Sequence, residues 1–153
     1  MDILIFTARK EHFKQIMELH KEGLQDTGAL SLDTSLDNDL DDLENSYSDG
    51  CFIVAATKCQ ADYIIGMGAI RKISGEHQIK RMRVKKEYRR QGIAQQMLEY
   101  LLDYAIEKGV NRLTLDTAES QLAAQKLYEK NGFTHYKNIV IGGVASKLYE
   151  IIL

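Results

Sequence analysis

The chain contains 153 residues, of which 44% are hydrophobic and 27% charged, and its formal net charge is −2. This composition is that of a globular protein rather than of a disordered chain, and no run of residues approaches the ~18 consecutive apolar residues of a membrane span. A single domain over residues 1–153 is therefore expected. Asp2 stands where a signal peptide would be basic, so we expect a cytoplasmic protein without membrane contact.

Hydrophobic spacing divides the first half of the chain into strands and helices. It predicts a strand at 3–9, a helix at 10–24 that ends by Gly23, a second and acidic helix marked by Leu36, Leu40, Leu43 and Tyr47, and strands at 51–57, 63–71 and 77–84. The run at 51–57 is apolar enough for a strand that is buried on both faces.

The second half of the chain predicts a long helix followed by shorter elements. The long helix begins after Gly92 and ends at Lys108–Gly109, where a basic last turn precedes a glycine C-cap. A strand at 112–117, a helix at 120–130 and strands at 133–138 and 146–153 follow. Strands and helices do not alternate strictly, which favours an α+β domain with a mixed sheet.

Neither a disulfide nor a metal site is expected. Cys51 and Cys59 flank one strand-like run and would lie about 26 Å apart, whereas a disulfide needs Cα atoms within about 7 Å. The histidines are scattered along the chain without the spacing of metal ligands. The acidic run at 37–48 carries Asp42 and Ser48 where a calcium-binding EF-hand loop needs Gly and Glu.

Charge is distributed unevenly along the chain. Between Arg71 and Arg90 nine Lys or Arg residues stand against two acids, whereas the segment from Asp33 to Asp49 carries seven acids and no base. Two differently charged ligand ends would explain this split, and two solvated faces are the alternative explanation.

The basic segment leads directly to Gly92 and to the apolar stripe of the long helix, which comprises Ile93, Met97, Leu98, Leu101, Leu102, Ala105 and Ile106. A helix N-terminus offers free N–H donors and a positive dipole end, so this arrangement indicates a bound anion. The pattern Arg89-x-x-Gly92-x-Ala94 lacks the Gly-Lys-Ser/Thr of a Walker loop. The anion is therefore not assigned by this pattern alone.

Three segments, in this order, resemble the GNAT superfamily of acyl-CoA N-acyltransferases. They are the run IKRMRV leading to the Arg89-x-x-Gly92-x-Ala94 turn, the strand LTLDT, and the run AAQKLYEKNGF at 123–133. The resemblance extends over essentially the whole chain. It implies an α+β fold with a twisted mixed sheet of about seven strands flanked by about four helices. It also implies that the protein is an N-acetyltransferase with acetyl-CoA as co-substrate and no metal.

The same resemblance assigns roles to individual residues. Backbone groups of Met82, Arg83 and Val84 would run beside the pantetheine arm of coenzyme A like one more strand. Tyr128 would stand near the thioester sulfur and protonate the departing thiolate. N–H groups of the turn would bind the pyrophosphate, and the basic residues around it would serve the 3′-phosphate. The turn comprises Arg89, Arg90, Gln91, Gly92, Ile93 and Ala94.

Four positions depart from the family pattern. Gln121 stands where relatives often have an Asn that touches pantetheine, and Lys86 where a proline is usual. Ala94 stands where many relatives have Gly, and Gln78 where relatives often have a Glu. An amine with a pKa near 10.4 is protonated at pH 7, and removing its proton costs about 4.6 kcal/mol, so a base or a water relay is needed. Gln78 cannot accept that proton. Glu76 or His77 is the candidate base or relay, and a water held by backbone carbonyls is a further alternative, unless Glu76 and His77 are merely solvated turn residues.

The predicted function is acetyl transfer to a primary amine of a small molecule or peptide. A non-catalytic acyl-CoA-binding or sensing module of the same fold is the alternative. Gln78 favours the module, and Tyr128 favours the enzyme. Nucleic acid is not an expected partner, because the basic segment has no interleaved aromatic residue beyond Tyr88. We expect a monomer or a homodimer.

The acidic segment suggests a class of acceptor. In the GNAT resemblance, the segment between the first strand and Cys51 borders the acceptor entrance. Its acids, which are Asp33, Asp37, Asp39, Asp41, Asp42, Glu44 and Asp49, would concentrate cationic amines and repel carboxylates. The charge pattern therefore predicts polyamine-like or lysine-like acceptors.

Overall fold

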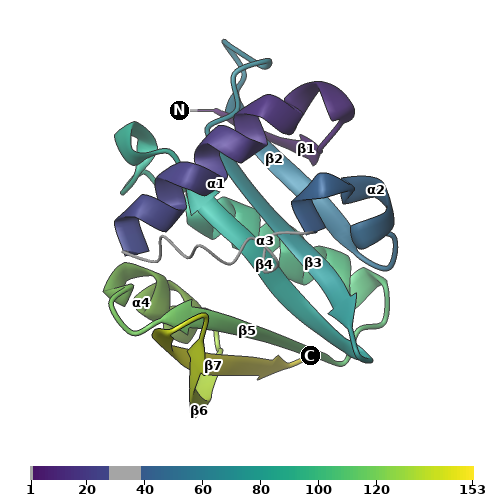
Figure 1. Cartoon of the computed structure of the whole chain (residues 1–153). Helices are drawn as coiled ribbons and strands as arrows, with labels where there is room; N and C mark the ends of the chain where they lie inside the picture. Colours follow the sequence, from purple (N-terminus) through teal and green to yellow (C-terminus); the bar gives the residue numbers. More distant parts are fainter. Residues whose placement is uncertain (1, 28–38) are drawn as a thin grey trace.

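A seven-stranded sheet forms the centre of the molecule, in the order β1-β2-β3-β4-β5-β7-β6 (Figure 1). The structure is a computed structural model and describes residues 2–27 and 39–153. The strands are β1 (Ile3–Thr7), β2 (Cys51–Thr57), β3 (Gly66–Ile73), β4 (Glu76–Val84), β5 (Arg112–Ala118), β6 (Thr134–Ile141) and β7 (Val144–Ile152). Neighbouring strands are antiparallel except β4 and β5, which are parallel. The predicted α+β fold with a mixed sheet is confirmed.

Helices cover both faces of this sheet. The α-helices are α1 (Phe13–Thr27), α2 (Leu43–Ser46), α3 (Ile93–Glu107) and α4 (Leu122–Lys130), and short 3-10 turns η1 (Lys10–His12) and η3 (Lys86–Tyr88) precede α1 and α3. Figure 1 shows α1 and α2 in front of the sheet and α3 behind it. The side chains of Gln95 in α3 and Asn131 after α4 exchange hydrogen bonds of 2.8 Å, which ties α4 to α3.

Two apolar cores result, one on each face. The larger lies between the sheet and α3, where Met97, Leu98 and Leu101 are fully buried. The smaller lies under α1 and α2 and contains Ile16 and Leu19. Strand β2 contributes alternate residues to both cores and is buried on both faces, as its apolar run predicts.

The prediction that the first helix ends by Gly23 is wrong, because α1 continues to Thr27. Gly23 serves close packing instead. A Cβ atom on Gly23 would lie 2.0 Å from the Nε of Arg83, so the missing side chain lets an arginine of β4 lie against the helix. A glycine used for close approach and one used as a C-cap look alike in the sequence.

Two other boundaries also differ from the prediction. Strand β3 begins at Gly66 rather than at residue 63, because the Ile64 N–H donates to the side chain of Gln15 in α1 (2.8 Å). Of the predicted acidic helix, the structure describes a 3-10 turn at 39–41 and the short helix α2. Leu36 lies outside the described residues.

Candidate active site

Strands β4 and β5 separate and leave a gap in the middle of the sheet. Their register pairs are His77 with Leu113 and Gln78 with Thr114. In Figure 1 the two strands lie together at the lower right and diverge toward the left. We call the space beyond Gln78 the β4–β5 gap. Beyond Gln78 no described residue of β5 pairs with β4, so another extended chain could lie along this edge of β4.

Backbone groups of β4 face the gap at alternate residues. The Lys85 N–H donates to the carbonyl of Ile65 before β3 (2.8 Å). Because successive residues of a strand turn their polar groups to opposite sides, Val84 and Met82 turn theirs toward β5. Their carbonyls accept bonds from side chains, from Arg83 Nη1 to Met82 (3.0 Å) and from Arg89 Nε to Val84 (3.3 Å). The backbone of Arg83 faces β3, so its contribution to the site lies in its side chain.

A β-bulge produces this divergence. Met67 of β3 pairs with Arg83 and Ala69 with Lys80, so Arg81 and Met82 together lie opposite Gly68. Arg81 has a left-handed backbone (φ 60°), and a Cβ on Gly68 would lie 2.5 Å from the sulfur of Met82. A bulge bends its strand and redirects side chains. Met82 and Val84 now pack against the larger core.

The turn before α3 presents unpaired N–H groups. Gly92 has φ 78° and caps α3 without any side-chain hydrogen bond. The first bond of the helix runs from the Gln96 N–H to the Gly92 carbonyl (3.1 Å), and no described residue accepts a bond from the N–H groups between Arg90 and Gln95. These groups point out of a helix N-terminus and form a site suited to an anion. The assignment of this anion to the pyrophosphate of coenzyme A stays a prediction.

A glutamate of α1 braces the same turn. Glu22 Oε1 accepts the Lys86 N–H (2.8 Å) and lies 4.0 Å from Arg89 Nη2. Lys86, Arg89 and Arg90 are exposed around the turn, where their charges would act on a phosphate.

Tyr128 lies in α4 with its ring in the larger core, 5.7 Å from the ring of Phe133. Burial raises the pKa of Tyr128 to about 12; the nearby charge of Arg83 opposes this rise and that of Asp116 adds to it. Among the described residues, none is hydrogen-bonded to its hydroxyl. The Tyr128 hydroxyl is therefore protonated at neutral pH, and no described residue accepts a hydrogen bond from it.

The predicted base residues lie away from the gap. Glu76 is the first residue of β4 and forms an ion pair with Arg112 (2.9 Å). His77 pairs with Leu113 where β4 and β5 are still hydrogen-bonded. Six residue steps separate Glu76 from Met82, which is about 20 Å along a strand. Gln121 caps α4 at the end of β5, beside the region where pantetheine is expected.

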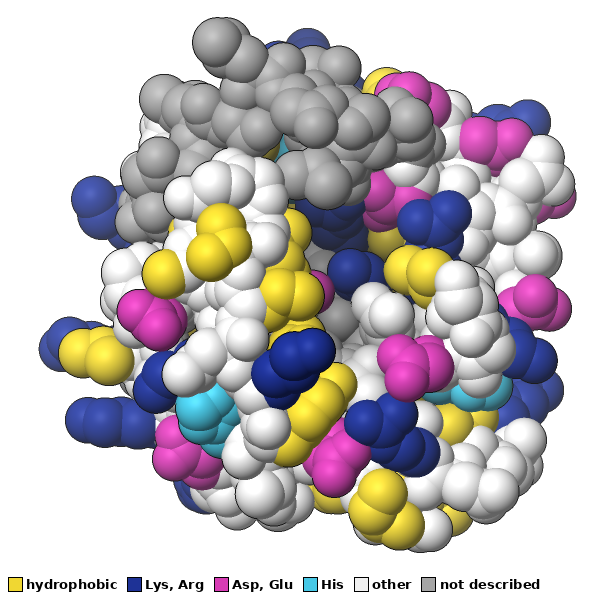
Figure 2. Space-filling model, turned by 60° about the horizontal axis from the view of Figure 1, so that its bottom comes forward, with side chains coloured by type: hydrophobic (Ala, Val, Ile, Leu, Met, Phe, Trp, Pro, Cys, Tyr) yellow, Lys and Arg dark blue, Asp and Glu magenta, His cyan; other side chains and the backbone are white. Residues whose placement is uncertain are grey.

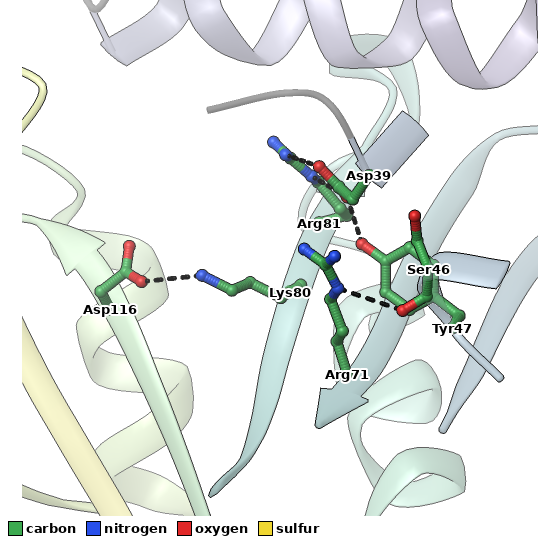
Figure 3. A network of polar contacts seen from close by, with 7 residues as sticks. All are labelled: Asp39, Ser46, Tyr47, Arg71, Lys80, Arg81 and Asp116. Atoms are coloured by element: carbon green, nitrogen blue, oxygen red, sulfur yellow. Dashed lines mark hydrogen bonds and ion pairs between the residues drawn. The ribbon is translucent and has the colours of Figure 1, made fainter. Parts of the chain in front are cut away.

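A polar network that the sequence did not indicate lies at the gap (Figure 3). Asp39 is buried and accepts two bonds from the guanidinium of Arg81 and one from the hydroxyl of Tyr47. Burial alone would raise the pKa of Asp39, but the bonds from Arg81 and Tyr47 and the charge of Arg81 lower it. Lys80 reaches across the gap to Asp116 of β5 (3.4 Å).

This network changes the expected role of one acid of the acidic segment. Asp39 is buried and pairs with Arg81, so it adds no charge at the surface, whereas Asp41, Asp42, Glu44 and Asp49 are exposed. Asp42 accepts the Asn45 N–H and caps α2. Asp33 and Asp37 lie outside the described residues. A buried Asp–Arg pair leaves no separate signal in the sequence, since the two residues stand 42 positions apart.

Other kinds of site receive no support. Within residues 2–27 and 39–153, no three His, Cys, Asp or Glu side chains gather as metal ligands. None of the helices in the described part of the chain is long and apolar enough to cross a membrane. Cys51 and Cys59 are both free thiols.

Comparisons with known proteins agree with this geometry. The chain is 35% identical over 79 residues to the uncharacterized N-acetyltransferase YsnE of Bacillus subtilis, covering 50% of this chain and 52% of that protein. It is 33% identical over 111 residues to human N-acetyltransferase 8, covering 67% of this chain and 48% of that protein. These matches thus span about half the length of each relative.

A solved structure extends the likeness of fold to the full length. The PaiA N-acetyltransferase of Thermoplasma acidophilum, in complex with coenzyme A, superposes with a TM-score of 0.80 at 19% identity and covers 100% of both chains. The model of the acetyltransferase (GNAT) family matches residues 13–133. This chain therefore belongs to the GNAT family of acetyltransferases.

Proposed function

We propose that this protein transfers the acetyl group of acetyl-CoA to a primary amine of a small molecule or peptide. The observation that supports the proposal is the β4–β5 gap, together with the N–H groups before α3 from which no described residue accepts a hydrogen bond. Tyr128 lies near enough to Arg83 of β4 and Asp116 of β5 for both charges to act on its pKa. The pyrophosphate binds at the turn from Arg89 to Ala94. Pantetheine lies along Met82 and Val84 as an additional strand, and the thioester ends near Tyr128.

The reaction requires one bond to form and one to break. The neutral amine nitrogen attacks the thioester carbonyl carbon, and the carbon–sulfur bond then breaks. Tyr128 donates its proton to the departing thiolate, whose conjugate acid has a pKa near 8.5. The pKa of about 12 keeps Tyr128 protonated until that step. The amine nitrogen loses one proton as the amide forms, and a proton returns to the Tyr128 phenolate, so the products are the neutral amide and the free thiol.

We propose that Asp116 accepts the proton that the amine loses. It stands on β5 at the gap, is held there by Lys80 at 3.4 Å, and lies close enough to Tyr128 to act on its pKa. A water between the amine and Asp116 would carry the proton. Glu76 and His77 remain the alternatives, at the closed end of the gap.

A non-catalytic acyl-CoA-binding module is the second candidate, favoured by Gln78 at the point where β4 and β5 separate. Two measurements distinguish the candidates. Acetyl-CoA at about 100 times its Kd should stabilise either protein by about 2.7 kcal/mol, a rise in Tm of several degrees. Release of free thiol from acetyl-CoA across a panel of amines is expected from the enzyme alone. Stabilisation without release on any amine would favour the module.

A further inference from the structure

The side of the sheet under α1 and α2 carries four cations beside the gap. We call Arg71, Lys80, Arg81 and Arg83 the basic cluster. Arg81 forms an ion pair with Asp39, and Lys80 forms one with Asp116. Arg83 lies against Gly23 of α1. Arg71 donates to the Ser46 carbonyl of α2 (3.1 Å). In Figure 2 this side of the molecule is hollowed near its centre, and Lys and Arg side chains lie in the hollow.

Two members of the basic cluster have no acidic partner. Asp39 neutralises Arg81, and Asp116 neutralises Lys80. No acid among the described residues pairs with Arg71 or Arg83. The Nε of Arg83 is covered and has no hydrogen-bond partner, and burial lowers the pKa of this guanidinium. The cluster thus holds an excess of two positive charges in a partly desolvated site, which favours an anion there.

Arg71 is the cation that is open to a ligand. Its Nε bonds to the Ser46 carbonyl, and its guanidinium lies 5.9 Å from the centre of the Tyr47 ring. Tyr47 is in turn bonded to Asp39, so these contacts fix the arginine before any ligand binds (Figure 3). None of the described residues accepts a bond from its Nη1 or Nη2. A guanidinium held in this way offers a planar pair of donors that matches a carboxylate.

The expected anion does not come from the donor substrate. The phosphates of acetyl-CoA are assigned to the turn at Gly92, and the thioester is neutral. On the proposed function, on which this step rests, the remaining ligand is the acceptor. We infer that the acceptor is an amine that carries a carboxylate, such as a free amino acid, and that Arg71 binds this carboxylate with support from the charge of Arg83.

This inference differs from the expectation of cationic acceptors. That expectation counted Asp39 among the acids of the entrance, and the structure places Asp39 in a buried ion pair with Arg81. A polyamine at the basic cluster would meet like charges.

Kinetics on matched amines provide the first test. Each common L-amino acid is compared with its methyl ester and with the amine that lacks the carboxylate, and spermidine and phosphoethanolamine are added. For at least one amino acid, we expect kcat/KM to be about 100-fold higher than for its methyl ester and for the corresponding amine without the carboxylate. Equal rates on the three forms, or a preference for spermidine or phosphoethanolamine, would overturn the inference while leaving the proposed function intact. No transfer to any amine would instead contradict the proposed function.

Variants of Arg71 provide the second test. Arg71→Met should raise the KM of the preferred amino acid by about 10- to 100-fold and leave the carboxylate-free amine unchanged. Arg71→Lys keeps the positive charge but loses the planar pair of donors. Its KM for the preferred amino acid should therefore lie between that of the wild type and that of Arg71→Met. Arg9→Met, which removes an exposed arginine from the other end of the sheet, is the matched control. Calorimetry can then measure the affinity of the N-acetyl amino acid for the protein–coenzyme A complex in the wild type and in each variant, without any reaction taking place. Equal affinity in the wild type and in both Arg71 variants would contradict the inference.

Discussion

The two halves of the proposed site would recognise their ligands by different means. On the donor side, backbone groups dominate: the N–H groups before α3 and the polar groups of Met82 and Val84. On the acceptor side, side chains from separate elements meet, and Arg71, Arg81 and Asp116 come from β3, β4 and β5. The backbone half suits a co-substrate shared by a whole family. The side-chain half can change its ligand by substitution without altering the fold.

Tyr128→Phe should have the largest effect, because it removes the proton donor at the junction of the two halves. We expect kcat to fall about 1000-fold, within the range of general acid catalysis. The fold should tolerate the change, since the hydroxyl has no described hydrogen-bond partner. Tyr149→Phe is the control, because it removes a hydroxyl bonded to Glu129 (3.0 Å) in the same core. Equal kcat in Tyr128→Phe and the wild type would reduce Tyr128 to a packing residue.

The pH profile sharpens this prediction. A general acid must be protonated, so activity that depends on Tyr128 falls only as pH rises through the pKa of about 12. No loss of kcat below pH ~10 should then come from this group. A loss near pH 9 that disappears in Tyr128→Phe would contradict the assignment.

Gly92→Glu tests the donor half alone. A side chain there meets no protein atom within 4 Å, so a loss of coenzyme A affinity would come from collision with the ligand and repulsion of its phosphates. We expect Kd for acetyl-CoA to rise about 100-fold by calorimetry. Gly109→Glu at the other end of α3 is the matched control, because Gly109 also has a positive φ (73°) and open space. If both variants bound equally well, the turn would not hold the pyrophosphate.

The same contrast explains what the sequence could predict. A backbone anion site requires a glycine, a helix start and nearby basic residues, and these stand consecutively from Lys85 to Ala94. The basic cluster depends instead on the bulge at Arg81 and on contacts such as Asp39 with Arg81, which join distant positions. Periodicity indicates which residues share a strand face, but a bulge shifts that face by one residue. No local pattern indicates the separation of β4 from β5; the family resemblance implied only that pantetheine would run beside Met82 and Val84 like one more strand.

Asp39→Asn tests whether the acceptor half is built on a buried ion pair. The variant keeps the shape but loses the charge that holds Arg81, and we expect about 2 kcal/mol less free energy of unfolding at pH 7. The pKa of Asp39 is lowered in the folded protein, so its contribution is present above the unfolded value of about 3.9 and disappears as pH falls through the folded value. The difference between variant and wild type should shrink accordingly below pH ~4 in denaturant titrations. Asp42→Asn, an exposed cap where Asn serves equally well, should show neither effect.

Gly23→Ala has the smallest expected effect and tests whether Arg83 belongs to the donor half or to the acceptor half of the site. The new methyl group would lie 2.0 Å from Nε and 2.4 Å from Cδ of Arg83, so this side chain must move. Alanine favours the helix by about 0.8–1 kcal/mol over glycine, which offsets the displacement, and the free energy of unfolding should change by less than about 1 kcal/mol. If Arg83 supports the acceptor carboxylate, kcat/KM for the amine should fall about fivefold while Kd for acetyl-CoA stays within about twofold. Lys21→Ala, on the exposed side of α1, controls for helix propensity. An equal loss of acetyl-CoA affinity would place Arg83 in the donor half and leave Arg71 as the only uncompensated cation assigned to the acceptor.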